Sequence, residues 1–280
     1  MSRVVWITGA GGLIGSHIVR AAPPDWNVRA VTRAEFDLTD FDAVTAAFRQ
    51  DRPQLVIHCA AMSRTPACEA HPELARRNNV DVTRALCELA REIFLIFFST
   101  DLVFDGRKGN YHETDEPSPL TVYGETKAAA ERIVLANPRH TVIRTSVNAG
   151  ATPRGDSSFN EQLRATWARG ETTTLFADEF RSPVSAAVTA RAAWELVALD
   201  KPGLYHLAGR ERLSRLEIGR VIAARWPQLN ARIEPSSIHD YSGPSRSPDT
   251  SLDSSKIQRL LSFPLPGFSD WLRANPQAEI

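Results

Sequence analysis

The chain has 280 residues, and its 33 Lys and Arg side chains balance its 33 Asp and Glu side chains. This length favours one large α/β domain or a large domain with a smaller lobe, and the zero net charge disfavours nucleic acids and anionic membranes as partners. The three cysteines form no Cys-x-x-Cys pair, signal-peptide features are missing, and no run approaches the ~20 apolar residues of a membrane span, so we expect a cytoplasmic protein without disulfides or a metal site.

The first predicted unit is a strand at 4–8, a glycine turn and a helix that continues through 16–20. Gly9, Gly12 and Gly15 have the Gly-x-x-Gly-x-x-Gly spacing of a dinucleotide-binding turn, with Leu13 and Ile14 before the last glycine. Glycine permits the tight turn and lets the backbone approach a pyrophosphate at the helix N-terminus. A glycine turn of purely structural origin is the alternative, but the position at the first strand-to-helix connection favours a cofactor.

The second strand is predicted at 27–32 and ends beside Arg33. Enzymes that select NAD usually place an acid about 20 residues after the glycines, whereas an arginine can meet the 2′-phosphate of NADP. Arg33 therefore favours NADP over NAD, although a solvated loop arginine is the ordinary alternative. Asp37 is a candidate for the adenine rim or only a turn acid; Leu38 follows it, and a helix is predicted at 41–49.

A third buried strand at 55–59 closes on Cys59, Ala60 and Ala61. Small residues at the carboxyl end of a strand leave room for a cofactor to lie against the backbone, although ordinary close packing explains them equally well. A long helix is then predicted at 72–91. Asn79 is unfavourable inside a helix, so we expect it to be either exposed or recruited for a hydrogen bond.

The candidate reaction centre lies within residues 99–127. A continuous apolar strand at 93–98 delivers Ser99 and Thr100 to its carboxyl end, the side on which open α/β sheets bind ligands. Tyr123 and Lys127 are four residues apart near the start of a predicted helix at 123–135, so the phenol and the ammonium share one face. A neighbouring ammonium lowers the pKa of a phenol from its ordinary value of ~10, and we therefore predict that Tyr123 is a proton donor.

The alternation of strands and helices up to the strand at 141–144 predicts an α/β protein with a Rossmann-like doubly wound parallel sheet. We assign 1–147 to a cofactor-binding Rossmann domain and 148–280 mainly to a smaller C-terminal α/β substrate lobe, with part of 184–210 returning to the first domain. The lobe segment is predicted to contain short strands at 172–176 and 203–207, and helices at 159–169, 184–199, 213–225 and 254–261.

Taken together, Thr-Gly-x-x-Gly-x-x-Gly at 8–15, Ser-Thr at 99–100 and Tyr-x-x-x-Lys at 123–127 resemble the extended short-chain dehydrogenase/reductase superfamily. Within it, the chain resembles the dTDP-4-dehydrorhamnose reductase family over nearly all of its length. The motifs that carry this resemblance are Ser-Thr-Asp-x-Val-Phe-Asp-Gly at 99–106, Pro-Leu-x-Val-Tyr-Gly at 119–124, Arg-Thr-Ser at 144–146, Phe-x-Ser-Pro at 180–183, Gly-x-Tyr-His-Leu-Ala-Gly at 203–209 and Ser-Leu-Asp-Ser-Ser-Lys at 251–256.

The resemblance implies an NADPH-dependent reductase that transfers hydride to the C4 ketone of a nucleotide-linked 4-keto-6-deoxysugar. It implies that Tyr123 protonates the oxygen, that Lys127 lowers the pKa of Tyr123 and holds the nicotinamide ribose, and that Thr100 binds the carbonyl. The implied cofactor contacts are Gly9, Gly12, Leu13, Ile14, Arg33, Asp37, Leu38, Cys59, Ala60, Ala61, Asn79, Tyr123 and Lys127. The implied substrate contacts are Ser63, Leu102, Val103, Phe104, Asn148, Phe159, Arg181 and Arg246.

Three departures from the family pattern concern the substrate side. Leu102 stands where the family usually has tyrosine, 147–149 replace an aromatic pair, and Arg181 replaces glycine, where it could meet a diphosphate or face solvent. A different sugar or nucleotide is therefore one expectation. Two other readings stay open: a cofactor-binding regulatory protein like the beta subunit of methionine adenosyltransferase, and a sugar-nucleotide epimerase. A homodimer is the usual assembly in the superfamily.

Overall fold

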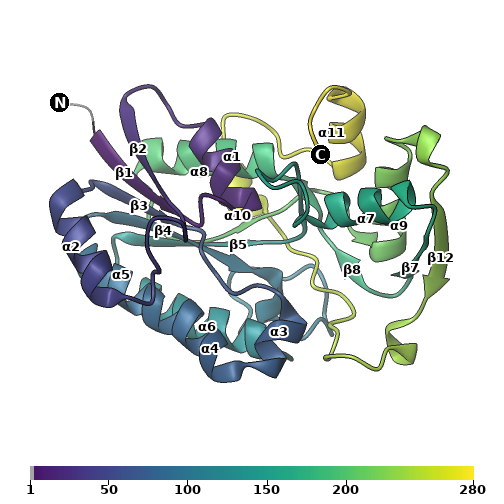
Figure 1. Ribbon diagram of the computed structural model, residues 1–280, viewed down its shortest axis with the longest axis horizontal. Helices are drawn as coiled ribbons and strands as arrows, with labels where there is room; N and C mark the ends of the chain where they lie inside the picture. Colours follow the sequence, from purple (N-terminus) through teal and green to yellow (C-terminus); the bar gives the residue numbers. More distant parts are fainter. Residues whose placement is uncertain (1–2) are drawn as a thin grey trace.

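The computed structural model describes residues 3–280, and its largest element is a six-stranded parallel sheet in the order β10-β5-β4-β3-β1-β2 (Figure 1). The strands are β1 (Arg3–Thr8), β2 (Trp26–Val31), β3 (Leu55–His58), β4 (Phe94–Thr100), β5 (His140–Thr145) and β10 (Gly203–Leu207). The predicted Rossmann-like doubly wound sheet is confirmed. Within 184–210, it is β10 that pairs with β5 at the edge of this sheet.

Helices cover both faces of the sheet because alternate side chains of each strand point in opposite directions. Val5 and Ile7 share one core with α1 (Leu13–Arg20) and α8 (Ala186–Leu199). Trp6 shares the other core with the helices of the opposite face, which are α2 (Phe41–Asp51), α5 (Val82–Leu89) and α6 (Val122–Leu135) (Figure 1). None of the helices in the described part of the chain has the length and apolar character that a bilayer crossing requires.

A smaller lobe with its own apolar core lies beyond the carboxyl ends of the large sheet, at the right of Figure 1. Leu163, Trp167, Ile218 and Phe268 are among the buried residues of this core. The elements of the lobe segment are β6 (Asn148–Ala149), α7 (Phe159–Ala168), β7 (Thr172–Phe176), β8 (Phe180–Arg181), β9 (Val184–Ser185), β11 (Leu213–Ser214), α9 (Arg215–Ala223), β12 (Arg232–Ser236), α10 (Ser255–Gln258) and α11 (Phe268–Ala274).

The helix predicted at 72–91 is present at 72–89, but it contains a π-helical turn that was not predicted. After the short α3 (Thr65–Ala70), α4 (Pro72–Arg76) continues through the π-helical turn Arg77–Asp81 into α5 without a break. A π-helical turn adds a residue to the helical repeat and so changes which side chains face inward. Here it turns Asn79 into the protein, where it is 1% exposed.

Three further elements in the last fifty residues differ from the predictions. The helix predicted at 254–261 is only the short α10, because the chain turns away after Gln258. Helix α11 and strand β12 were not predicted. Pro235 argues against a central strand, but β12 pairs only with β7, and an edge strand tolerates proline.

Candidate functional site

The glycine turn lies where the strand order of the sheet reverses, between β1 and β3. Open α/β sheets bind ligands at the carboxyl ends of the strands at such a point. Gly9 has φ +66°, and a Cβ atom there would lie 2.7 Å from the backbone nitrogen of Ala60. A Cβ atom on Gly15 would lie 2.3 Å from the carbonyl oxygen of Gly9. The close approach of the turn to β3 and to α1 therefore requires glycine at both positions.

The N-terminus of α1 offers free backbone donors at this turn. Gly12 is the N-cap and provides no side chain to cap the helix, and Leu13 and Ile14 are the first helical residues. The first amides of a helix have no partner within the helix, and the helix dipole adds positive potential there. A phosphate group fits such a position without further charged residues.

A cluster of charged residues lies beyond the end of β2. The carboxylate of Asp37 accepts hydrogen bonds from the Thr39 amide at 2.9 Å and from the Thr39 hydroxyl at 3.0 Å. These bonds, together with the charges of Arg33 and Arg77, lower the pKa of Asp37. Arg77 was not among the predicted residues, because only the tertiary fold brings the π-helical turn next to the loop after β2, where Arg77 donates to the Thr39 carbonyl oxygen at 3.0 Å.

A chain of buried hydrogen bonds supports the floor of the site. Thr8 Oγ1 lies 2.7 Å from His58 Nδ1, and His58 Nε2 lies 3.1 Å from Thr83 Oγ1. The Thr83 hydroxyl donates to the Asn79 carbonyl oxygen at 2.7 Å, so its oxygen accepts the proton on His58 Nε2. Burial, with the charge of Lys127, lowers the pKa of His58 to about 3 and keeps the ring neutral.

Asn79 connects this chain of hydrogen bonds to α6. Its amide oxygen accepts from the Met62 amide at 2.8 Å, and its amide nitrogen donates to the Met62 carbonyl and to Thr126 Oγ1, both at 3.0 Å. Thr126 in turn donates to the Tyr123 carbonyl oxygen at 2.9 Å. Of the two alternatives for Asn79, recruitment for a hydrogen bond is correct. Its amide is engaged by the protein, so it positions the loop after β3 rather than offering a free group to a cofactor.

Thr100, Tyr123 and Lys127 come together at the carboxyl end of β4. Thr100 lies beside the phenol of Tyr123 and lowers its pKa, and the Thr100 hydroxyl donates to Asp101 Oδ1 at 3.1 Å. Lys127 is 2% exposed, donates to the Phe98 carbonyl oxygen at 2.7 Å and lies 3.8 Å from the ring centroid of Phe97. A Cβ atom on Gly124 would lie 2.3 Å from the Leu102 carbonyl oxygen, so glycine allows the start of α6 to approach the turn after β4.

The pKa of Tyr123 differs from the prediction. Burial raises it, the charge of Asp101 raises it further, and only the hydrogen bond to Thr100 opposes these effects. Burial also lowers the pKa of Lys127 to about 7, against the charge of Glu131. The ammonium is directed at a carbonyl oxygen, not at the phenol, which explains why the predicted lowering of the phenol pKa is absent.

Two other side chains lie at the ends of β4 and β3. Within residues 3–280, Ser99 Oγ is buried without a hydrogen-bond partner, so it can bind an incoming polar group without breaking an internal bond. Burial raises the pKa of the Cys59 thiol, which therefore stays neutral beside Lys127. A glycine cradle, free helix amides and an unpartnered hydroxyl all suit a dinucleotide.

The lobe contributes a group of charges that the sequence did not reveal. The Glu179 carboxylate is fully buried and accepts from Arg181 at 2.8 Å, from Arg215 at 3.0 Å and from Arg246 at 2.6 Å. Burial alone would raise the pKa of Glu179, but the three arginines together lower it far below its usual range. The side chains of Arg215 and Arg246 remain 17% and 28% exposed, so their guanidinium groups can still meet an anion.

Four of the predicted substrate contacts have to be corrected. Val103 and Phe104 have 0% exposure, and their side chains pack in a small core with Tyr111. Asn148 donates to Thr145 Oγ1 and to the Ser146 carbonyl and accepts from the Thr189 hydroxyl, which occupies its amide. Arg181 was expected to meet a diphosphate or face solvent, but it is 2% exposed and paired within the protein.

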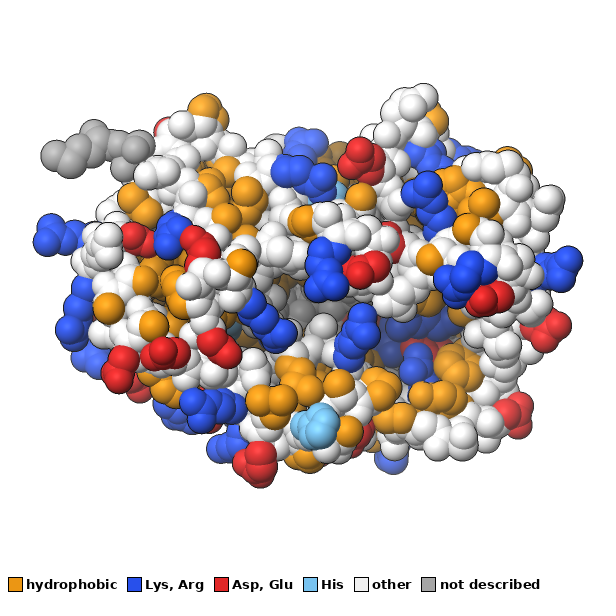
Figure 2. Space-filling model, in the orientation of Figure 1, with side chains coloured by type: hydrophobic (Ala, Val, Ile, Leu, Met, Phe, Trp, Pro, Cys, Tyr) orange, Lys and Arg blue, Asp and Glu red, His pale blue; other side chains and the backbone are white. Residues whose placement is uncertain are grey.

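The remaining predicted substrate residues keep accessible surface. Ser63 is exposed, whereas Leu102, Phe159 and Arg246 are partly buried. The Arg215 guanidinium carbon lies 5.0 Å from the ring centroid of Phe159. Figure 2 shows a hollow across the middle of this face, with basic side chains around its rim and a deeper basic group toward the lobe.

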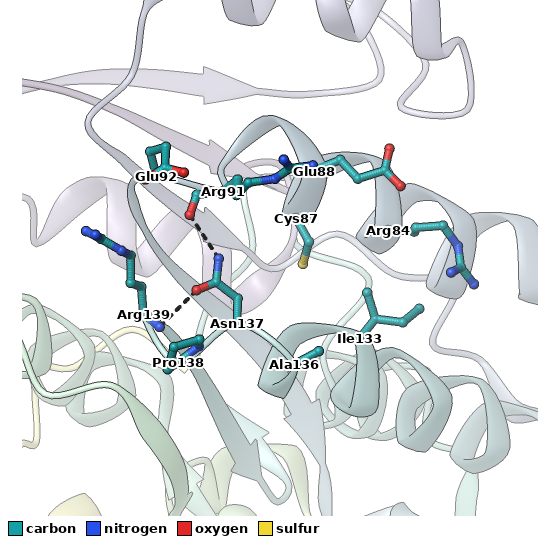
Figure 3. A pocket seen from close by; sticks show the side chains of 10 residues that line it. All are labelled: Arg84, Cys87, Glu88, Arg91, Glu92, Ile133, Ala136, Asn137, Pro138 and Arg139. Carbon is teal, nitrogen blue, oxygen red and sulfur yellow. Dashed lines mark hydrogen bonds between the residues drawn. The ribbon is translucent and has the colours of Figure 1, made fainter.

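A separate cavity of about 520 Å³ lies on the outer side of α5 and α6 (Figure 3). Asn137 closes one side of it by donating to the Arg91 carbonyl oxygen at 2.9 Å. The residues that line it are Arg84, Cys87, Glu88, Arg91, Glu92, Ile133, Ala136, Asn137, Pro138 and Arg139. None of these belongs to the motifs described above, so this cavity is not part of the candidate site.

Known proteins resemble the chain over almost its whole length. The probable low-salt glycan biosynthesis reductase Agl14 of Haloferax volcanii is 32% identical, over 96% of each chain. Methionine adenosyltransferase 2 subunit beta of Xenopus laevis is 30% identical, over 92% of this chain and 83% of that protein. The structure of dTDP-4-dehydrorhamnose reductase from Bacillus anthracis in complex with NADP has the same fold, with a TM-score of 0.91 and 23% identity over 98% of both chains.

A family model decides the assignment, because it covers the glycine turn, the group at the end of β4 and the lobe in one continuous match. The model is that of the RmlD substrate binding domain, and it matches residues 3–277. The predicted resemblance is thereby confirmed, and the chain belongs to the RmlD substrate binding domain family.

Proposed function

We propose that this protein is an NADPH-dependent reductase of a nucleotide-linked 4-keto-6-deoxysugar. The observation that carries the proposal is the meeting of Thr100, Tyr123 and Lys127 at the end of β4, on the same edge of the sheet as the glycine turn. The names of two similar proteins, a glycan biosynthesis reductase and dTDP-4-dehydrorhamnose reductase, support the same reaction type.

The cofactor side of the proposal rests on how this chain suits a dinucleotide. The amides at the start of α1 would bind the pyrophosphate, with Gly9 and Gly12 giving it access to the backbone. Arg33 and Arg77 would meet a 2′-phosphate near Asp37, which favours NADPH over NADH. The similar reductase from Bacillus anthracis was crystallised with NADP.

The protein's own part in the reaction is to deliver one proton while the ketone is held in place. Bound NADPH supplies the hydride to the carbonyl carbon. The phenol of Tyr123 gives its proton to the carbonyl oxygen as negative charge develops there. The raised pKa of Tyr123 keeps the phenol protonated near neutral pH, which a proton donor needs. Lys127 would fix the nicotinamide ribose from its buried position at the end of β4.

The lobe would hold the nucleotide diphosphate of the substrate. Arg181, Arg215 and Arg246 share the buried Glu179 carboxylate, and Arg181 also pairs with Asp101, so three guanidinium groups face two negative charges at this position. The surplus positive charge favours an anion, and guanidinium groups match phosphate oxygens in geometry. Phe176 and Tyr241 pack beside Arg246, with their ring centroids 4.9 Å and 5.4 Å from its guanidinium carbon.

Tyr123→Phe tests the proton donor directly. We expect kcat to fall about 10²- to 10⁴-fold, the usual contribution of general acid catalysis, while the Kd for NADPH stays unchanged. Stopped-flow turnover and fluorescence titration measure the two quantities. Tyr205→Phe is the matched control, because the Tyr205 hydroxyl makes only a 3.5 Å contact with the Pro202 carbonyl. Full turnover by Tyr123→Phe would exclude the assignment.

One assay separates this proposal from a regulatory role, which the resemblance to methionine adenosyltransferase 2 subunit beta makes a specific alternative. The protein is mixed with NADPH or NADH and with dTDP-4-dehydrorhamnose, and the absorbance of the reduced nicotinamide is followed. Oxidation that requires both protein and sugar, faster with NADPH, supports the reductase. Tight binding of NADPH without oxidation of any nucleotide-linked ketosugar favours the regulatory alternative.

A further inference from the structure

Asp101 directly follows Thr100 and is bound on both carboxylate oxygens. Its Oδ1 accepts from the Thr100 hydroxyl at 3.1 Å. Its Oδ2 accepts from the Ser146 hydroxyl at 2.6 Å and from the Thr250 hydroxyl at 3.1 Å. The residue is 4% exposed, so its negative charge acts on its neighbours with little screening by water.

Arg181 brings the compensating charge from the lobe. Its Nη1 lies 3.4 Å from Asp101 Oδ2, and its Nε and Nη2 donate to Glu179 Oε1 at 3.2 Å and 2.8 Å. Arg181 Nη1 also contacts the Thr250 hydroxyl. Asp101, Glu179 and Arg181 are all at least 96% buried. Such a group needs each of its charges, because removing one partner leaves another unpaired in the interior.

The Thr100 hydroxyl has one proton and two possible acceptors for it. When that proton goes to Asp101, the Thr100 oxygen is an acceptor for the protonated phenol of Tyr123. Once Tyr123 has released its proton, the phenolate needs a donor, and the Thr100 hydroxyl can serve only by leaving Asp101. The strength of the bond between Thr100 and Asp101 therefore affects how readily Tyr123 gives up its proton.

We propose that Asp101 and Arg181 are a positioning pair: Asp101 orients the Thr100 hydroxyl beside Tyr123, and Arg181 holds Asp101 from the lobe and neutralises its charge. This inference rests on the reduction proposed above, and it adds Asp101 and Arg181 to the residues that act in that reaction. Because Arg181 belongs to β8 and Asp101 follows β4, the pair also links the position of the lobe to the proton donor.

The charged and titratable groups that face the phenol are few. Asp101 reaches it from the turn after β4, and Cys68 reaches it from α3. Burial and the charge of Glu69 raise the pKa of Cys68, so the thiol is neutral near pH 7. Lys127 lies on the same helix as Tyr123 and binds the Phe98 carbonyl. Asp101 is therefore the negative charge that a substitution can remove.

The test compares pH profiles of kcat/KM for the wild type, Asp101→Asn, Arg181→Met and the double variant. Reduction needs a protonated phenol, so kcat/KM falls as pH rises through the pKa of Tyr123. We expect Asp101→Asn to move this fall to lower pH by about one unit or more, the usual effect of a nearby charge, and Arg181→Met to move it to higher pH. The double variant, which again lacks net charge at the pair, should return close to the wild-type profile. A purely structural role would lower the rate without moving the profile.

A second measurement does not depend on turnover. The chain has four tyrosines, and their ionisation is followed by absorbance as the pH is raised. Each protein in the comparison is titrated with and without the additional substitution Tyr123→Phe. The difference between the two titrations is the ionisation of Tyr123. If this titration shifts as expected but no ketosugar is reduced, the pair stands and the proposed function fails. If turnover is present but neither single variant moves the profile or the titration, the pair is excluded. Asp101→Asn keeps the shape of the side chain and leaves Arg181 paired with Glu179, so it decides the question even if Arg181→Met fails to fold.

Discussion

The buried ammonium group of Lys127 destabilises the folded protein, but it has a role in the proposed reaction. Its pKa is lowered to about 7 from 10.5, chiefly by burial. Between these two values the unfolded chain binds more protons than the folded chain, so the free energy of unfolding should rise with pH across this window. A residue that costs stability in this way is typical of a functional site.

Lys127→Met should therefore stabilise the protein while removing its activity. We expect the free energy of unfolding at pH 7 to increase by about 1–3 kcal/mol, because a buried cation is lost and only one hydrogen bond, to the Phe98 carbonyl, is lost with it. The gain should shrink as pH rises toward 10, where Lys127 is neutral in the folded protein. Urea unfolding at both pH values measures this, with the exposed Lys201→Met as control. Equal or lower stability at pH 7 would contradict the prediction.

At the scale of elements, the π-helical turn Arg77–Asp81 determines which of two neighbouring asparagines is buried. It directs Asn79 inward, and Asn79 then joins the loop after β3 to helix α6 through Met62 and Thr126. The neighbouring Asn78 lies on the same turn but only donates to the Leu74 carbonyl at 2.9 Å. The two asparagines form a matched pair with different structural roles.

Asn79→Ala should lower the free energy of unfolding by about 2–4 kcal/mol, because it removes two hydrogen bonds to the Met62 backbone and one to Thr126 from a largely buried site. Asn78→Ala should change it by less than about 1 kcal/mol, since that amide is partly exposed. Urea unfolding of both variants tests the difference. Similar losses for the two would show that the turn as a whole, and not the Asn79 bridge, carries the stability.

At the scale of the whole molecule, one carboxylate holds together several segments that are far apart in sequence. Glu179 binds Arg181 beside it, Arg215 at the start of α9 and Arg246, which is 67 residues further along the chain. Its pKa is lowered in the folded protein, so its contribution to stability is present above pH 4.5, the ordinary value, and is lost as pH falls below it.

Glu179→Gln should cost about 3–5 kcal/mol of unfolding free energy at pH 7, because three guanidinium groups lose their shared partner. The variant should also lose less further stability on acidification than the wild type does. Urea unfolding at pH 7 and near pH 3.5 checks both effects. Glu171→Gln, which removes an exposed ion pair with Arg169, should have little effect at either pH. A parallel decline of wild type and Glu179→Gln on acidification would contradict the prediction.

The sequence by itself determined what depends on local pattern. The spacing of Gly9, Gly12 and Gly15, the apolar run before Thr100 and the four-residue step from Tyr123 to Lys127 are short-range features, and each predicts a local conformation and its chemistry. Alternating strands and helices are enough to predict a doubly wound sheet, because crossover rules leave few other topologies.

Only the tertiary structure decided what depends on the meeting of distant segments. It moved Arg181 from a presumed substrate contact into a buried pair with Asp101, 80 residues away in the chain. It placed Val103 and Phe104 in a core and turned Asn79 inward. It also reversed the expected direction of the pKa of Tyr123. The physical reason is common to all of these: burial and charge pairing are properties of the space around a side chain, and that space is built by residues that no local pattern connects.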